Sequence, residues 1–316
     1  MERRTYLLIV LGLIALVGLG CGRGNSQRQQ PGPIAVRETY QGSYPIQVVA
    51  TTGMVADLVK HVGGERVAVR QLIPAGEDPH VYPPAPRDAQ MLAEADIIFY
   101  SGRNLEGKLT DTLVRMARQK PIFAVTDYIN DAAILEDEEG HYDPHLWFDV
   151  GLWSQTVHVV RDALSAFDPP HGDEYARHAA AYEAQLKALD QEIAQELLQV
   201  PPTQRKLVTA HDAFRYFGQR YGYEVRGLQG ISTENEPGVK KINELVHYLA
   251  DNNIKAVFVE TSVPKKAMQA LIAGCQHQRQ HTVQIGGELF SDSMAKDGTY
   301  EHMIRHNVKT IVAGLR

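Results

Sequence analysis

The chain has 316 residues, 44% of them hydrophobic and 22% charged, and this globular composition excludes collagen, coiled coils and general disorder. Its 38 acidic residues outnumber its 32 basic ones, so the net charge is -6 and nucleic acid is a poor candidate partner. With only two cysteines, a disulfide framework and a cysteine-rich metal centre are excluded, and a metal site would have to use carboxylates and some of the 13 His.

The first 20 residues are typical of a signal peptide. Arg3 and Arg4 precede an apolar run over residues 6–19, which is shorter than the ~20 residues that span a membrane comfortably. A small residue, Gly20, precedes Cys21, as in bacterial lipoprotein signals, although Gly18 stands where such signals usually carry Leu. We therefore predict lipidation of Cys21, with plain secretory cleavage as the alternative.

Residues 21–44 form a polar segment that contains Gly and Pro and cannot build a core of its own. We expect it to be a flexible tether. A lipid anchor followed by such a tether would hold the remaining protein on the extracytoplasmic side of a membrane.

The body from residue 45 onward alternates short β-branched runs with helical patterns. In its first part, strands are predicted at residues 46–50, 67–73, 96–100 and 122–125. A second set is predicted at residues 207–210, 224–226, 256–260 and 282–285. This alternation predicts an α/β fold of two lobes, residues 45–170 and 201–316, each with a four-stranded parallel sheet flanked by helices.

One long helix is predicted to join the two lobes within residues 171–200. Apolar side chains recur on one stripe between residues 173 and 200, charged ones lie on the opposite face, and Pro201 and Pro202 end the pattern. At ~1.5 Å per residue this helix would be about 40 Å long. A single stiff connection favours limited motion between the lobes.

Four polar residues stand in loops that follow predicted strands, where parallel α/β domains bind their ligands. His80 and His145 each end an Asp-Pro-His tripeptide, and His211 directly follows its strand. Asp292 follows the last strand through an expected turn at Gly286-Gly287. Each lobe thus contributes two candidate ligands.

Three imidazoles and one carboxylate suit zinc, manganese or iron(II), whereas calcium and magnesium require more oxygen ligands. The proline of each Asp-Pro-His stiffens the approach to the histidine. Taken singly, a loop His is more often a surface or capping residue, and an Asp after a strand is usually a helix N-cap. Spacing alone therefore leaves both interpretations open.

Six segments together resemble one family, the TroA-like, zinc- and manganese-binding (cluster A-I) substrate-binding lipoproteins of ABC transporters. They are PAGEDPH (74–80), NLEG (104–107), DPHLW (143–147), TAHDAF (209–214), GIST (230–233) and RHNV (305–308). The likeness covers nearly the whole chain from residue 46 to 315. It implies that the metal ligands are His80, His145, His211 and Asp292.

The resemblance also implies a function: capture of a divalent metal ion outside the membrane, and its delivery to an ABC permease powered by a cytoplasmic ATPase. No enzymatic reaction is implied, and the sequence has no Gly-x-Ser-x-Gly and no His-Glu-x-x-His motif. We expect a monomer in which side chains such as Glu260 and Asp212 orient the imidazoles from behind.

The expected cargo is Mn²⁺ or Zn²⁺, with Fe²⁺ as a further alternative. Zinc-dedicated members often carry a long His-rich loop before the second ligand, but residues 135–141 contain only His141. Residues 258–266 and 286–292 look more like manganese-associated members. Histidine ligands nevertheless hold zinc more tightly than manganese in solution, so the sequence favours manganese only as the transported ion.

Two other functions remain open from the sequence, a surface adhesin-type lipoprotein and a metallohydrolase with the same donors around a water. Among other candidate ligands, Cys275 has helical spacing that indicates a core thiol. His302 and His306 are four residues apart in a predicted final helix but have no third partner nearby. Trp147 and Trp153 are expected to pack around the second ligand loop.

Overall fold

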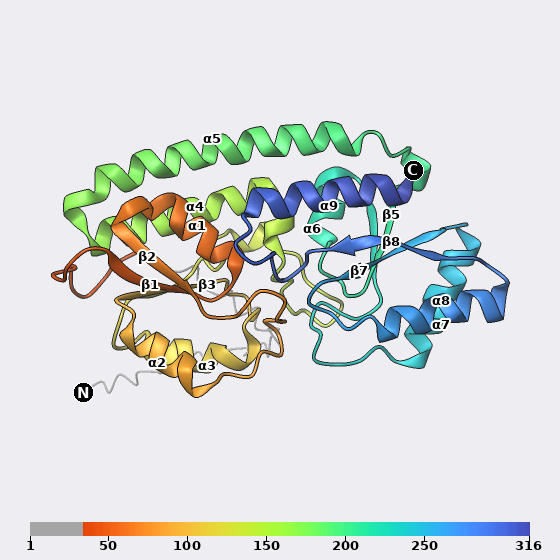
Figure 1. The fold of residues 1–316 in the computed structure, drawn as a ribbon, viewed down its shortest axis with the longest axis horizontal. Helices are drawn as coiled ribbons and strands as arrows, with labels where there is room; N and C mark the ends of the chain where they lie inside the picture. The colour runs from red at the N-terminus through yellow and green to blue at the C-terminus, as the bar shows by residue number, and fades with distance from the viewer. Residues whose placement is uncertain (1–33) are drawn as a thin grey trace, which may run out of the picture.

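The computed structural model describes residues 34–316 (Figure 1). The predicted signal peptide, Cys21 and the first part of the predicted tether lie outside the described residues. Among residues 34–316, no helix is both long enough and apolar enough to cross a membrane.

As predicted, the first four strands form one parallel sheet, and their order in it is β2-β1-β3-β4. They are β1 (Ile46–Ala50), β2 (Val67–Gln71), β3 (Ile97–Tyr100) and β4 (Ile122–Ala124). The central strands are buried on both faces, which explains their near-continuous apolar sequences. Along β1, Ile46, Val48 and Ala50 belong to one core and Val49 to another, because successive side chains point to opposite faces.

Helices cover both faces of this sheet (Figure 1). On one side lie α1 (Gly53–Gly63) and α4 (Val150–Phe167), and on the other α2 (Pro86–Glu94) and α3 (Gly107–Met116). We call β1–β4 with these four helices the first half. Short 3-10 helices occur at Gly64–Arg66, Asp131–Ala133, Leu146–Phe148, Pro169–His171 and Pro202–Gln204.

The second half contains four strands that form two parallel pairs. β5 (Lys206–Thr209) pairs with β6 (Glu224–Gly227), and β7 (Ala256–Glu260) pairs with β8 (Gln284–Leu289). The strands and their parallel direction are confirmed, but the single four-stranded sheet expected here is not formed. Although β5 lies beside β7, the backbone N–H of His211 at the end of β5 donates to the Glu260 side chain rather than to a backbone carbonyl.

The helices of the second half are α6 (Arg215–Tyr221), α7 (Val239–Asp251), α8 (Lys266–Arg279) and α9 (Tyr300–Leu315). α7 and α8 pack together on one side of the strands, and α9 lies against β8 on the other (Figure 1). Cys275 is a buried thiol in the core between α7, α8 and the strands, as predicted.

The turn expected at Gly286-Gly287 is wrong, because both glycines lie inside β8. β8 passes directly beneath α9, and a Cβ at Gly287 would collide with Thr310 of that helix. The register of β7 with β8 also shifts at this point. The two glycines therefore allow close packing of strand and helix and do not reverse the chain.

The long helix α5 (Gly172–Leu197) has 26 residues, or about 39 Å at 1.5 Å per residue, and confirms the predicted connection. It runs along one side of the first half and of the adjoining part of the second half, where it covers α1, α4 and α9 (Figure 1). Its buried stripe includes Tyr175, Tyr182 and Leu189. The hydrophobic core beneath α5 is continuous from the first half into the second.

The C-terminal helix α9 belongs to the second half, but its first turn packs against the first half. Its first residue, Tyr300, is fully buried, and its backbone N–H donates to Asp57 of α1 at 3.1 Å. The Tyr300 hydroxyl donates to the carbonyl of Trp147 at 2.7 Å. The two halves are thus joined by α5, by α9 and by the buried surroundings of Trp147.

The last residues of the predicted tether contact the first half. The backbone N–H of Tyr40 donates to the carbonyl of Phe167 at 2.6 Å, and the two rings pack together. The hydroxyl of Tyr44 donates to Asp168 at 2.8 Å, at the C-terminal end of α4.

Candidate metal centre

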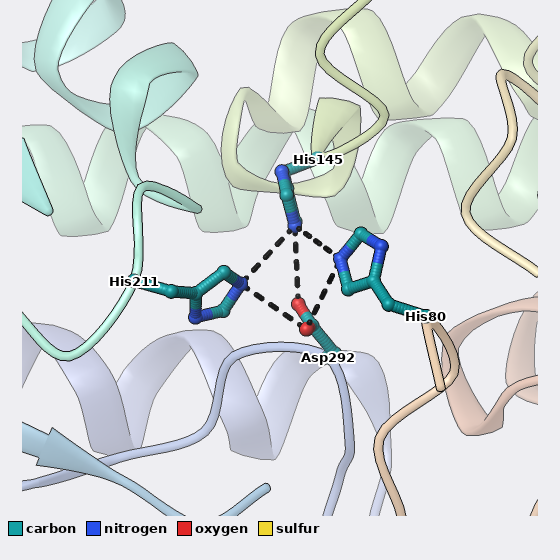
Figure 2. Close-up of side chains that lie close together, drawn as sticks. All are labelled: His80, His145, His211 and Asp292. Atoms are coloured by element: carbon teal, nitrogen blue, oxygen red, sulfur yellow. Dashed lines mark hydrogen bonds and ion pairs between the residues drawn. The ribbon is translucent and has the colours of Figure 1, made fainter. Parts of the chain in front are cut away.

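The four predicted ligands converge at one point between the two halves (Figure 2). One ligand atom from each of His80, His145, His211 and Asp292 lies within 4.8 Å of the other three, and all four residues are buried. His80 and His145 come from loops after β2 and β4, whereas His211 and Asp292 follow β5 and β8. The carboxyl-terminal ends of strands in both halves therefore supply the site.

The Nε2 atoms of the three histidines all face the Asp292 carboxylate. They lie 3.6 Å (His80), 3.3 Å (His145) and 3.1 Å (His211) from its oxygens. His145 Nε2 is also 3.3 Å from Nε2 of each other histidine. Three imidazole nitrogens and a carboxylate oxygen at such separations can all be ligands of one ion.

The Asp292 side chain is fully buried. Within residues 34–316, neither of its oxygens has a hydrogen-bond partner that meets both the distance and the angle requirements. A buried carboxylate without donors is costly unless a positive charge compensates it. Protonated imidazoles or a metal cation can supply that charge. The donor set thus fits a cation at the centre of the four residues.

The two Asp-Pro-His tripeptides have the same local geometry. Oδ1 of Asp78 accepts the backbone N–H of His80 at 2.9 Å, and Oδ1 of Asp143 accepts that of His145 at 3.1 Å. Such a bond from an Asp side chain to the backbone two residues later stabilises a tight turn. The aspartate thus positions the backbone of each histidine.

Carboxylates also orient two of the three rings. Asp143 Oδ1 lies 2.7 Å from Nδ1 of His145, and Glu260 Oε2 bonds to Nδ1 of His211. Glu260 also accepts the backbone N–H of His211 at 2.9 Å. A proton held on Nδ1 leaves Nε2 of each ring free as a metal ligand.

Glu260 thus makes the contact expected of it, whereas Asp212 does not. Asp212 lies 3.9 Å from Arg215 instead of binding an imidazole. Asp143 was not among the predicted orienting residues. Its position two residues before His145, in the repeated Asp-Pro-His, could have indicated this contact.

The charges of the site perturb the pKa of each group. Burial lowers the pKa of His80 to about 3. Burial also acts to lower the pKa of His145, but the carboxylates of Asp292 and Asp143 outweigh it and raise this pKa to about 9. For His211, burial is likewise outweighed by Asp292 and Glu260, so the pKa lies well above its usual value.

Burial acts to raise the pKa of Asp292, but His211 and His145 hold it well below its usual range. In the metal-free site the carboxylate is therefore ionised and faces two protonated imidazoles. A metal ion must displace those protons to bind, so binding is coupled to proton release.

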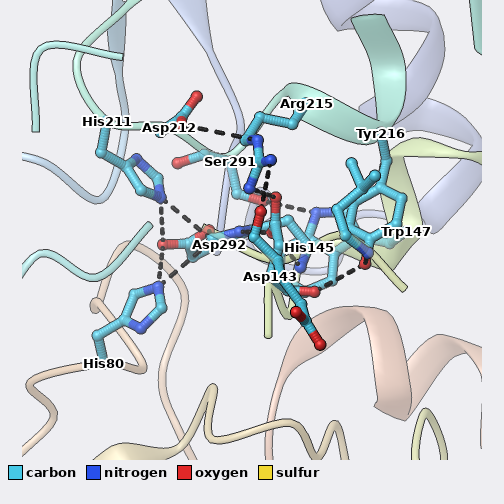
Figure 3. A network of polar contacts seen from close by, with 12 residues as sticks. His80, Asp143, His145, Trp147, His211, Asp212, Arg215, Tyr216, Ser291 and Asp292 are labelled. Atoms are coloured by element: carbon cyan, nitrogen blue, oxygen red, sulfur yellow. Dashed lines mark hydrogen bonds and ion pairs between the residues drawn. The ribbon is translucent and has the colours of Figure 1, made fainter. Parts of the chain in front are cut away.

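Further polar contacts support the second ligand loop (Figure 3). The indole Nε1 of Trp147 donates to the carbonyl of Ser291 at 3.1 Å, next to Asp292, and its ring packs edge-on against His145. The hydroxyl of Tyr216 donates to the carbonyl of Asp143 at 2.9 Å. Trp147 therefore packs as predicted, while Trp153 stacks on Tyr300.

The remaining candidate ligands lie elsewhere. His302 is exposed on α9, and Nε2 of His306 is 3.0 Å from the carbonyl of Glu288. Over residues 34–316, the cluster of His80, His145, His211 and Asp292 is the only group of three or more such side chains placed to hold a metal ion.

Comparisons with known proteins agree with this geometry. A family model described as "ZnuA: Zinc-uptake complex component A periplasmic" matches residues 48–314. The chain is 42% identical to the manganese-binding lipoprotein MntA of Bacillus subtilis over 322 positions, which cover 100% of both chains. It is 41% identical to the zinc-binding protein TroA of Treponema pallidum over 85% of this chain and 88% of that protein.

Solved structures give the same result for the fold. The structure of the periplasmic zinc-binding protein TroA from Treponema pallidum superimposes with a TM-score of 0.83, covering 85% of this chain and 99% of that one at 41% identity. The structure of Fe(III)-bound YtgA from Chlamydia trachomatis has a TM-score of 0.78 at 26% identity, with 85% and 98% covered.

Proposed function

Because this chain belongs to the ZnuA family of periplasmic zinc-uptake components, we propose that it is the extracytoplasmic substrate-binding component of an ABC importer for a divalent transition metal. The observation that carries this function is the buried cluster of His80, His145, His211 and Asp292. Its donors fit a transition-metal ion, and no catalytic reaction is inferred.

We infer that these four residues are the metal ligands and that the ion is held between two lobes, residues 45–170 and 201–316. Orphaned oxygens on Asp292 and three converging Nε2 atoms support this assignment. Burial excludes water from the ion, while the continuous core beneath α5 favours a limited opening of the lobes over a large hinge motion.

The proposed cargo is Mn²⁺ or Zn²⁺, and we favour Mn²⁺ as the transported ion. MntA of Bacillus subtilis is named for manganese, TroA of Treponema pallidum for zinc, and the YtgA structure holds iron, so the donor set alone does not select one metal. Three imidazoles should bind Zn²⁺ more tightly than Mn²⁺ in solution, following the general order of metal affinities.

We further propose that the protein is a monomer anchored to the membrane by a lipid on Cys21, and that it delivers its ion to a permease driven by a cytoplasmic ATPase. The family and the lipoprotein relatives support this placement. The names of these relatives refer to metal binding and transport and do not favour the adhesin alternative.

Elemental analysis and calorimetry test the function directly. The protein without residues 1–21 is stripped of metal and titrated separately with Mn²⁺ and Zn²⁺. We expect close to one equivalent of either ion, loss of binding in His211→Ala, and unchanged binding in His302→Ala, whose side chain is exposed on α9. If neither ion produces heat or remains bound, the transport function is wrong.

A further inference from the structure

The three imidazoles of the metal site are held in different ways. Nδ1 of His145 and of His211 each bonds to a buried carboxylate. In the described part of the chain, Nδ1 of His80 has no such partner, since the polar contacts of His80 are made by Nε2 and the backbone N–H. Figure 2 shows this second ring nitrogen pointing away from the cluster. The position of His80 therefore depends on its loop.

That loop, residues 74–80, is bonded to the second half at two places. The hydroxyl of Ser293 accepts the backbone N–H of Gly76 at 2.6 Å. The hydroxyl of Thr233 donates to Oδ2 of Asp78 at 2.5 Å. We call these two hydrogen bonds the loop latch.

The loop latch acts on His80 through a short path. The same Asp78 carboxylate that accepts from Thr233 also accepts the backbone N–H of His80 through its other oxygen. Ser293 directly follows Asp292, so the bond between Gly76 and Ser293 joins the His80 loop to the residue next to Asp292. The two bonds thus hold the loop that carries His80 against two segments of the second half, one of which carries Asp292.

The loop is also the exposed wall of the site. Residues 74–77 are exposed, whereas His145, His211 and Asp292 lie beneath buried side chains such as Trp147. At the opposite side, α5, α9 and the Trp147–Ser291 contact join the halves through buried groups. In the loop, only Pro79 and His80 are buried, so its movement exposes few buried side chains.

We propose that Thr233 and Ser293 are positioning residues that set the rate of metal release, by keeping the His80 loop closed against the second half. When the loop latch opens, His80 leaves the ion first, while His145, His211 and Asp292 still hold it. This inference rests on the proposed metal-binding function, because it concerns how the same site lets its ion go.

Release of Zn²⁺ tests the proposal. The zinc-loaded protein without residues 1–21 is mixed with excess 4-(2-pyridylazo)resorcinol in a stopped-flow instrument, and the absorbance of the zinc complex gives the dissociation rate. Thr233→Val removes a bond to a charged acceptor and should speed release by about tenfold, and Ser293→Ala by about fivefold. Thr233→Ser keeps the hydroxyl and should restore the slow rate.

The association rate and the melting temperature of the metal-free protein separate this role from a merely structural one. We expect both to stay close to wild type in Thr233→Val, because Thr233 and Asp78 are only partly buried and no ligand is removed. Thr282→Val is the matched control, since Thr282 is an exposed residue of the second half whose hydroxyl donates to Gln276 at 3.5 Å, far in sequence from the loop of residues 74–80.

Two failures can be told apart. If wild-type protein retains no Zn²⁺, the proposed function fails. If wild type binds Zn²⁺ but Thr233→Val and Ser293→Ala release it at the wild-type rate, or if Thr282→Val speeds release equally, the loop latch does not control release and only this inference is wrong.

Discussion

Replacing Glu260 with Gln should weaken metal binding even though the two side chains have nearly the same shape. In the structure both carboxylate oxygens accept hydrogen bonds from His211, one from its backbone N–H at 2.9 Å and one from ring Nδ1. A Gln side chain offers one accepting oxygen and one donating NH₂ group. It therefore cannot accept both of these hydrogen bonds.

The favoured orientation of Gln places its oxygen at the backbone N–H and its NH₂ at Nδ1. Nδ1 of His211 must then accept, so the ring proton moves to Nε2, the atom that faces Asp292 and the ion. The other orientation sets two buried donors against each other, at a cost of about 1–3 kcal/mol. Loss of a group that orients a ligand typically reduces metal affinity by 10–100-fold, and we expect the Kd for Zn²⁺ to rise by about that factor, or ~1.4–2.8 kcal/mol.

Competition titration of Zn²⁺ and Mn²⁺ against a chelator of known affinity measures this change. Glu288→Gln is the control, because Glu288 is an exposed carboxylate paired with Lys265 at 2.8 Å and away from the site. A folded Glu260→Gln protein whose Kd stayed within about twofold of wild type would refute the argument that Glu260 sets the position of the proton on His211.

Three further predictions follow from the site and from its packing. Asp292→Asn removes the one charged ligand, and we expect calorimetry to show metal affinity reduced about a hundredfold or more. Burial acts to lower the pKa of His145, but the carboxylates of Asp292 and Asp143 outweigh it and raise this pKa to about 9. The imidazole is therefore protonated below that pH, and a metal ion must compete with the proton. Titrations between about pH 6 and 8 should show metal affinity weakening as the pH falls. In Gly287→Ala the new Cβ would collide with Thr310, and urea denaturation should show the free energy of unfolding reduced by about 2 kcal/mol. The control is Gly238→Ala, which has open space around its Cβ position and should change this free energy by less than about 0.5 kcal/mol.

The fold could be predicted where each strand and helix carries its own pattern. β1 and β7 are buried apolar runs, and α5 shows one buried stripe over 26 residues, so these elements were visible in the sequence. The glycines at 286 and 287 misled the prediction because a glycine pair often marks a turn. Here the pair instead leaves room for α9, and only the three-dimensional packing reveals that neighbour.

That the four proposed ligands lie together was predictable for a related reason. In parallel sheets the carboxyl-terminal ends of strands meet at one edge, so residues that directly follow strands are brought together without knowledge of side-chain packing. The repeated Asp-Pro-His added a local signal, because the bonds from Asp78 to His80 and from Asp143 to His145 span only two residues each. Contacts of this kind can be inferred from sequence spacing.

Apart from Asp143, which is two residues from His145, the groups that hold the ligand loops and rings are of the opposite kind. Glu260 reaches His211 across 49 positions of the chain, and Thr233 reaches Asp78 across 155. Both pairs exist only because particular loops lie side by side once the halves have packed. A Glu at a strand end or a Thr in a Gly-rich loop has many ordinary uses. Glu260 was therefore expected only alongside Asp212, which contacts Arg215 instead, and Thr233 was not predicted. The proposed ligands are thus encoded locally, whereas the bonds from Glu260 to His211 and from Thr233 to Asp78 depend on long-range packing between loops.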